Sequence, residues 1–229
     1  MGTGPRVVSL VPSVTETLLA WRVRPVACTR FCEQPELPHV GGTKNPDVDA
    51  IVALQPDLVV MDEEENRRED HDALVAAGVT VHATAVRSLA DVDPCLAALA
   101  EAVGARFEPA GPVAVPPAAH RAFVPIWRRP WMALGAPTYG QSLLASLGWS
   151  VVPEGGGPYP EVTLTEAAEA APDAVVAPSE PYPFGPRHAR ELRKVAGRVV
   201  FVDGHDLFWW GVRTPGARER LGTVLDADG

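Results

Sequence analysis

The sequence has no run of apolar residues long enough to cross a bilayer as a helix, so we expect no membrane insertion. Lysine and arginine are also few: 20 of them stand against 29 aspartates and glutamates, the formal net charge is −9, and the arginines are scattered along the chain. Because a phosphate backbone is bound mainly through clustered lysine and arginine, this composition argues against a nucleic-acid partner.

Cysteine is scarce too. Cys28, Cys32 and Cys95 are an odd number without a paired framework, which is typical of a reducing compartment. The first ten residues show no charged region followed by an apolar stretch, and no lipid-accepting cysteine. Both observations predict a cytoplasmic protein.

What the chain does contain is an internal duplication. Three segments of the first half recur in the second half, in the same order: 12–20 (PSVTETLLA) and 137–145 (PTYGQSLLA), 50–60 and 166–176, and 77–81 and 196–200. The first pair follows predicted strands at 7–11 and 131–134, and each copy carries a Ser/Thr-x-x-Glu/Gln capping box at a predicted helix start. The second pair predicts a helix that a proline stops before a buried strand, and the third predicts a C-cap glycine before another strand.

Two similar lobes follow from the duplication. A proline-rich segment at 107–120 separates a first lobe, 1–106, from a second, 121–229, and its composition favours a stiff, extended connector. Each lobe alternates strands with helices, which predicts an α/β fold with a mainly parallel sheet covered on both faces.

The rule for parallel sheets locates the candidate site. Ligands bind beyond the carboxyl ends of the strands, and the loops expected there hold most of the aromatic side chains, with many glutamates and arginines. Exposed aromatic area is a liability on a surface without a binding role, so these loops predict a rigid, aromatic-walled pocket with convergent charges.

Several motifs resemble one family over nearly the whole chain. Residues 8–16 (VSLVPSVTE), 41–46 (GGTKNP), 56–60 (PDLVV) and 203–204 (DG) resemble the cobalamin and iron-chelate substrate-binding proteins of ABC importers. Residues 64–70, 125–132, 159–162 and 178–184 look closest to a signal-less branch labelled cobalamin-binding or helical backbone metal receptor proteins.

The resemblance implies two α/β lobes that grip one ligand in a cleft between them. Two features depart from the family: its long connecting helix is replaced by the short proline-rich segment, and no export signal is seen, which argues against docking to an ABC permease. Asp49 and Glu166 occupy roughly the positions of the acidic docking residues of importing relatives. They are also explained as first-turn acids that stabilise helix dipoles.

The candidate ligand-binding residues come from these loops and from the resemblance. They are Ser13, Thr15, Arg30, Phe31, Thr43, Lys44, Glu64, Glu65, Asn66, Arg67, Trp127, Arg128, Tyr139, Tyr159, Glu180, Tyr182, Phe184, Trp209, Trp210 and Arg213. The roles of Glu65, Asn66 and Arg67 rest mostly on the resemblance, because a run of acids at a helix start is also explained by the helix dipole. Salt bridges to acidic loops are the alternative role for the arginines, and Trp131 is expected in the core.

The sequence offers two candidate metal ligands and no zinc-like motif. Glu65 and His205 are the candidates, and Cys32 with His39 lacks a zinc-like spacing, so Cys32 is expected to be a buried structural thiol.

Two functions stay open at this point. The first is non-catalytic capture of a small polar or metal-chelating ligand, with a corrinoid or a chelated metal ion as the candidates. A smaller chelate than a corrin is preferred, because the loops are crowded with charges. The second is an enzyme that uses Glu65 or Glu180 as a general acid or base on a small metabolite.

Overall fold

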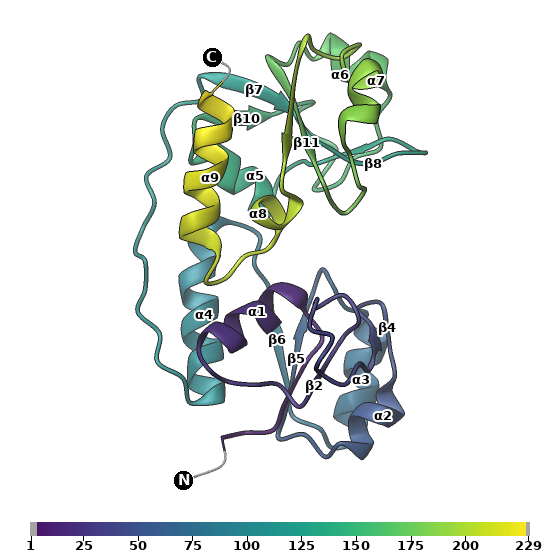
Figure 1. Ribbon diagram of the computed structural model, residues 1–229, viewed down its shortest axis with the longest axis vertical. Coiled ribbons are helices and arrows are strands. Elements are labelled where there is room, and N and C mark those ends of the chain that lie inside the picture. The colour runs from purple at the N-terminus through teal and green to yellow at the C-terminus, as the bar shows by residue number, and fades with distance from the viewer. Residues whose placement is uncertain (1–3, 228–229) are drawn as a thin grey trace. The chain divides into compact units, whose positions relative to one another are not determined.

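The computed structural model describes residues 4–227 and divides them into two compact units (Figure 1). Unit 1 comprises residues 4–86, 91–110 and 210–212, and unit 2 comprises residues 87–90, 111–209 and 213–227. Within the described residues no helix combines the length and the apolar character needed to span a membrane.

Unit 1 is built on a four-stranded parallel sheet in the order β2-β1-β5-β6. In Figure 1, α1 and α4 lie on one side of this sheet and α2 and α3 on the other. The bounds are β1 Val7–Ser9, α1 Pro12–Ala20, β2 Ala27–Cys28, β3 Gly41–Gly42, β4 Asn45–Pro46, α2 Val48–Ala53, β5 Leu58–Asp62, α3 Arg68–Ala76, β6 Val81–Thr84 and α4 Leu89–Val103. The strands β3 and β4 form a separate antiparallel hairpin, and the first residues of α4, Leu89 and Ala90, belong to unit 2.

Unit 2 repeats this plan. Its parallel sheet has the order β10-β7-β11-β12, so both sheets place their strands in the sequence second, first, third, fourth. The bounds are β7 His120–Phe123, β8 Pro125–Trp127, β9 Met132–Ala133, α5 Tyr139–Ala145, β10 Trp149–Val151, α6 Leu164–Glu169, β11 Ala174–Pro178, the 3-10 helix η1 Pro186–His188, α7 Ala189–Leu192, β12 Arg198–Val202, α8 Gly204–Phe208 and α9 Thr214–Asp226. In Figure 1, α5 and α9 lie on one side of the sheet and α6 and α7 on the other.

The predicted α/β architecture with two similar halves is therefore confirmed, and the duplication extends to single hydrogen bonds. Asp57 accepts a hydrogen bond from the backbone N–H of Arg6 at 2.7 Å, and Asp173 accepts one from Arg121 at the same distance. Each unit also has its own buried core, around Val59 of β5 and Val175 of β11.

The helix-to-strand turn is duplicated as well. Gln55 and Ala171 stand directly before the prolines that follow α2 and α6, and both adopt the left-handed conformation, with φ of 48° and 47°. Proline disfavours the α region for the residue before it, which ends each helix here. The expected order of helix, proline and buried strand is thus confirmed in both units.

One strand was placed wrongly from the sequence. The first parallel strand of unit 2 is β7, at His120–Phe123, and not the segment 131–134. Met132–Ala133 instead pairs antiparallel with Pro125–Trp127 in a small hairpin. This hairpin lies between β7 and α5, and it explains why the first repeated segment has a larger offset, 137−12=125, than the second, 172−56=116.

Two capping predictions also need correction. Ser13 lies inside α1 behind Pro12, the N-cap is Val11, and no side chain caps this helix, because proline at the first position supplies no N–H to be satisfied. Thr138 does cap α5, accepting from the N–H of Gln141 at 3.2 Å. Gly78 has the positive φ of a C-cap, at 79°, whereas Gly197 is not among the residues with positive φ.

The proline-rich segment has no regular secondary structure up to residue 119. Residues 105–119 form neither helix nor strand, and several of their side chains are exposed.

Candidate functional site

The parallel strands of each unit end at one edge of its sheet, and the loops predicted to bind ligand follow those ends. In unit 1 the strands end at Ser9, Cys28, Asp62 and Thr84. In unit 2 they end at Phe123, Val151, Pro178 and Val202. We describe the two edges separately.

A buried carboxylate organises the loop after β5. Asp62 accepts hydrogen bonds from the backbone N–H groups of Glu64 and Glu65, at 2.9 and 3.3 Å, and from the hydroxyl of Thr84 at 2.7 Å. Burial raises the pKa of Asp62, although these three bonds oppose the shift. The turn that carries Glu64 and Glu65 is therefore fixed from inside, while both glutamate side chains are exposed.

Asn66 locks the same loop to its neighbours. Its side-chain oxygen accepts from the N–H of Asp62 at 2.8 Å, and its amide donates to the carbonyl groups of Thr43 and Leu10, at 2.8 and 3.3 Å. The ammonium group of Lys44 donates to the carbonyl oxygen of Glu64. The sequence placed Asn66 among the ligand contacts, and the structure uses all of its polar atoms within the protein.

Arg67 is exposed beside this loop and pairs with its own helix. Its guanidinium donates two hydrogen bonds of 2.9 Å to the two carboxylate oxygens of Asp70. The hydrogen bonds and charge of Asp70 raise the pKa of Arg67, so it stays cationic.

The loop after β2 presents an aromatic ring. The Phe31 side chain is 50% exposed, and the guanidinium of Arg30 lies 4.8 Å from its centroid, a cation–π arrangement. Two other candidates near this edge, Ser13 and Thr15, are buried, and the Thr15 hydroxyl lies 2.9 Å from the hydroxyl of Ser9.

An aromatic cluster marks the edge of unit 2. Trp127 is 44% exposed, and its ring meets Tyr182 edge-on at 5.7 Å between centroids. Tyr182 in turn contacts Phe184 at 4.7 Å, and Phe184 stacks on Trp131 at 5.9 Å. Phe184 is buried and Trp131 packs on the core, so only the outer part of the cluster is available to a ligand. Tyr159, on the loop after β10, is 37% exposed.

Arg128 is held beside this cluster. Its Nε donates to the carboxylate of Glu191 at 3.0 Å, and hydrogen bonding to Tyr182, with the carboxylate's charge, raises the pKa of Arg128.

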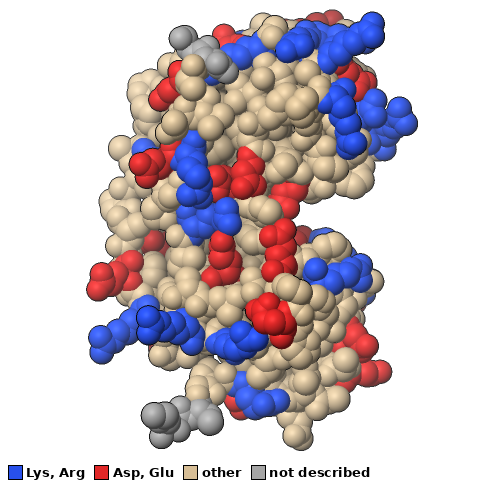
Figure 2. All heavy atoms as spheres, viewed as in Figure 1, with Lys and Arg blue, Asp and Glu red and all other residues tan. Residues whose placement is uncertain are grey.

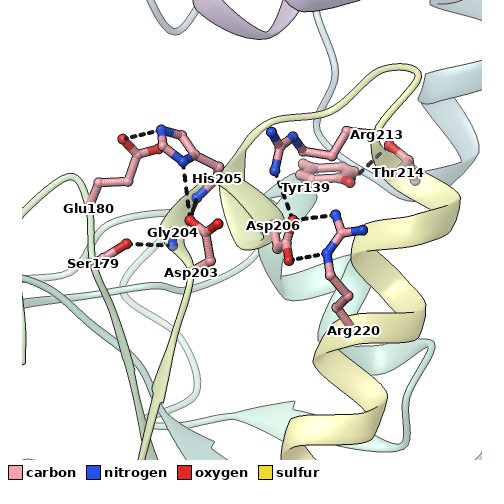
Figure 3. Close-up of polar contacts among 10 residues, drawn as sticks. All are labelled: Tyr139, Ser179, Glu180, Asp203, Gly204, His205, Asp206, Arg213, Thr214 and Arg220. Carbon is pink, nitrogen blue, oxygen red and sulfur yellow. Dashed lines mark hydrogen bonds and ion pairs between the residues drawn. The ribbon is translucent and has the colours of Figure 1, made fainter. Parts of the chain in front are cut away.

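The loop after β12 holds two adjacent polar networks (Figure 3). In the first, the ring of His205 lies between two carboxylates, with Nδ1 3.1 Å from Asp203 and Nε2 3.5 Å from Glu180. The Trp209 ring meets His205 edge-on at 4.3 Å. The segments that carry Glu180 and His205 can come this close because residue 204 is glycine: a Cβ there would lie 2.6 Å from the backbone nitrogen of Glu180.

In the second network, buried Asp206 joins two arginines (Figure 3). It accepts from Arg213 at 2.9 Å and from Arg220 at 2.6 and 2.7 Å. Hydrogen bonds from Arg220, then from Arg213, lower the pKa of Asp206. Nearby, the hydroxyl of Tyr139 lies 3.0 Å from that of Thr214, and burial raises the pKa of Tyr139 to about 12.

The candidate residues thus fall into two groups. Those with partly or largely exposed side chains are Arg30, Phe31, Thr43, Lys44, Glu64, Glu65, Arg67, Trp127, Arg128, Tyr159, Glu180, Tyr182, Trp209 and Arg213. Those that are buried are Ser13, Thr15, Asn66, Tyr139, Phe184 and Trp210. Asp62 and Arg220 are not among the candidate residues named from the sequence. For Arg220 a signal existed, since it stands two helical turns after Arg213.

Neither the distribution of charged side chains nor the arrangement of potential metal ligands singles out one site among the described residues. Figure 2 shows lysines and arginines dispersed over the visible face among acidic residues. Across residues 4–227, no group of three or more His, Cys, Asp or Glu side chains is arranged to hold a metal ion.

Comparison with known proteins shows which proteins share this fold. A family model described as periplasmic binding protein matches residues 7–108. The chain is 25% identical over 195 residues to the vitamin B12-binding protein of Salmonella typhi, covering 75% of this chain and 71% of that protein. Among solved structures it is similar to the periplasmic vitamin B12 binding protein BtuF of Vibrio cholerae, with a TM-score of 0.78, 19% identity and 98% and 97% of the two chains covered.

Heme-binding proteins have the same fold. The periplasmic heme-binding protein BhuT, solved with two hemes, aligns with a TM-score of 0.77 and 23% identity over 98% of both chains. A periplasmic heme-binding protein of Pseudomonas aeruginosa aligns with a TM-score of 0.78 and 20% identity, over 96% of this chain and 92% of that one. By the family match over residues 7–108 and by a fold shared over nearly its whole length, the protein is similar to the cobalamin and iron-chelate binding proteins among the periplasmic binding proteins.

Proposed function

We propose that the protein binds a planar, metal-chelating macrocycle of the corrin or porphyrin type, reversibly and without catalysis. One observation carries the proposal: Phe31, Trp127 and Tyr159 are exposed aromatic side chains that all come after the carboxyl ends of parallel strands. Phe31 and Tyr159 stand on the loops after β2 and β10, and Trp127 is the last residue of the hairpin strand β8, which follows β7. An aromatic side chain buries about 150–250 Å² when it is covered, so leaving three of them in water favours a flat apolar partner.

The exposed rings change the preference among ligands. The charged loops favoured a chelate smaller than a corrin. However, Arg67 pairs with Asp70 and Arg128 with Glu191, so part of this charge is balanced within the protein. Relatives named for vitamin B12 and heme also support a macrocycle. Arg30, next to Phe31, is placed to pair with a carboxylate or amide at the rim of such a ligand.

Titration with cyanocobalamin and, separately, with hemin tests the proposal by calorimetry and by quenching of tryptophan fluorescence. We expect micromolar or tighter binding of one of them. Trp127→Ala should weaken that binding by about tenfold, since a stacked ring contributes on the order of 1 kcal/mol or more. Val224→Ala, an exposed apolar residue of α9, is the matched control and should leave the affinity unchanged. Failure of both ligands to bind would contradict the proposal.

A catalytic role has one observation in its favour, the placement of Glu180 and Asp203 on either side of His205. A carboxylate and an imidazole in this arrangement can exchange a proton with a bound substrate. If the site is an enzyme, mass spectrometry will show turnover of the bound compound, and Glu180→Gln will abolish turnover while binding survives. Glu65→Gln tests the other acidic candidate in the same way.

We further propose that the protein acts in the cytoplasm. The support is that Cys28, Cys32 and Cys95 are all free thiols. Fractionation of the native host followed by immunoblotting tests this, and recovery of the protein outside the cytosolic fraction would contradict it.

A further inference from the structure

Two of the three thiols lie together in the loop that carries Phe31. Cys28 is the last residue of β2, and Cys32 follows four residues later. Both are buried, and they pack with Leu37 in a small apolar cluster, whereas Arg30 and Phe31, which stand between them in the sequence, are exposed.

Two hydroxyl groups and a thiol lie around the sulfur of Cys32. The hydroxyl groups of Thr15 and Thr29 each lie 3.2 Å from it, and the thiol of Cys28 hydrogen-bonds to it as well. The bond from Cys28, followed by those from Thr15 and Thr29, lowers the pKa of Cys32, whereas the pKa of Cys28 is raised by the same bond and by burial. The two sulfurs therefore pack in one small cluster, and the one whose pKa is lowered is the better nucleophile, which is the arrangement that favours oxidation of one sulfur and capture by the other.

We propose that Cys28 and Cys32 form an oxidisable dithiol site, whose conversion to a disulfide by a hydroperoxide moves the Phe31 loop and weakens ligand binding. The effect on binding rests on the function proposed above, whereas the disulfide itself does not.

Hydrogen peroxide is the only oxidant that this reaction needs. The Cys32 thiolate attacks one peroxide oxygen, the O–O bond breaks, and hydroxide leaves, so that the sulfur becomes a sulfenic acid. The Cys28 sulfur then attacks the Cys32 sulfur, the S–O bond breaks, and the departing hydroxide takes the Cys28 proton to form water. The two thiols lose two electrons in total, and the peroxide gains them.

The loop between the two sulfurs transmits the change. Formation of the bond draws the sulfurs from hydrogen-bond contact to covalent distance, and the three residues between them must adjust. Phe31 is positioned by a hydrogen bond of 3.3 Å from its backbone N–H to the Thr29 hydroxyl, and Arg30 by one of 3.0 Å from its N–H to the carbonyl of Gly41. Because the Thr29 hydroxyl also contacts Cys32, loss of the thiolate alters the support of the Phe31 ring.

Trypsin provides a direct test, because it cuts after Arg30, between the two cysteines. The protein is treated with hydrogen peroxide, freed of peroxide, alkylated and digested without reductant. We expect peptides 23–30 and 31–44 to be recovered joined, about 2 Da lighter than their sum, and to separate on addition of dithiothreitol. Recovery of the two peptides unjoined, whether unmodified or with Cys32 oxidised to sulfinic acid, would overturn the proposal.

Cys95 supplies the matched control. It is partly buried without a thiol partner, and burial raises its pKa to about 11, so it should stay reduced under the same treatment. Cys95→Ser should keep the crosslink and Cys28→Ser should lose it.

The binding consequence is measured apart from the crosslink. Affinity for cyanocobalamin and hemin is compared before oxidation, after oxidation and after reduction with dithiothreitol. We expect a loss of about tenfold on oxidation that reduction reverses. A crosslinked protein with unchanged affinity would overturn the coupling to Phe31. If neither ligand binds the reduced protein, the proposed function fails while the peptide map still decides the dithiol site.

Discussion

Asp206 offers the sharpest test of how unit 2 is held together. The carboxylate is buried, with 6% of its side chain exposed, and it accepts three short hydrogen bonds from Arg213 and Arg220 (Figure 3). Asp206→Asn preserves the shape and removes the charge, which leaves two guanidinium groups near each other with only an amide oxygen to share.

The expected cost follows from the exposure of the partners. A hydrogen bond between charged groups contributes about 1.5–3 kcal/mol when it is buried, and an exposed ion pair contributes about 0.2–1 kcal/mol. The Arg213 side chain is 20% exposed, so its bond to Asp206 is expected to contribute as a buried one. The Arg220 side chain is 55% exposed, so its bonds are expected to contribute as an exposed ion pair. We therefore expect a loss of about 2–3 kcal/mol in the free energy of unfolding, or roughly 4–12 °C in Tm for a chain of this size.

The pH dependence identifies the charge as the cause. The arginines lower the pKa of Asp206 in the folded state, so the stabilisation is fully present above the pKa of the unfolded aspartate and is lost as the pH falls through the folded value. Urea unfolding of both proteins should show a constant difference between pH 7 and 5, and a smaller one below about pH 4. Asp226→Asn, at the exposed end of α9, is the control and should lie within about 0.5 kcal/mol of the wild type. A difference under 0.5 kcal/mol at pH 7, or one that persists undiminished in acid, would refute this reasoning.

Three further substitutions test other parts of the fold by urea unfolding. Gly204→Ala should cost about 2 kcal/mol or more, because its Cβ would meet the backbone of Glu180, whereas Gly197→Ala, with open space, should be nearly neutral. Asn66→Ala should cost about 2–4 kcal/mol, since it leaves buried backbone groups without partners, and an effect below 1 kcal/mol would contradict the locking role of Asn66. Thr163→Ala removes the capping box of α6 and should cost about 1 kcal/mol, with a cost near zero as the contrary result.

The architecture could be predicted from the sequence because its signals are local and occur twice. The proline that ends each short helix, the apolar strand that follows, and the order of these elements give two α/β halves without any knowledge of distant contacts. The position of β7 could not be obtained in this way. His120 and Arg121, its first two residues, are exposed, so only its second half carries a buried-strand pattern, and the segment at 131–134 looked more apolar.

The candidate site was predictable only in outline. The rule on strand ends selected loops that do follow the parallel strands, but which side chains face water depends on partners far away in the sequence. Asn66 donates a hydrogen bond to the carbonyl group of Leu10, 56 residues away, and Arg128 donates one to the carboxylate of Glu191, 63 residues away. Asp62, which organises the acidic turn, is the last residue of β5 and is buried, so its role depends on contacts that the sequence does not show.

A left-handed residue stands before the proline at the same point of both units, so one molecule contains the same backbone feature twice. Gln55 and Ala171 adopt the same conformation although their side chains differ, and this conformation costs a residue with a Cβ on the order of 1 kcal/mol. Gln55→Gly and Ala171→Gly should therefore each relieve part of that strain, offset by the greater freedom glycine gives to the unfolded chain. If both substitutions raise the free energy of unfolding, the same local strain is present in both units. The two positions would then be sites for stabilising the protein without changing the segments that carry Phe31 and Trp127.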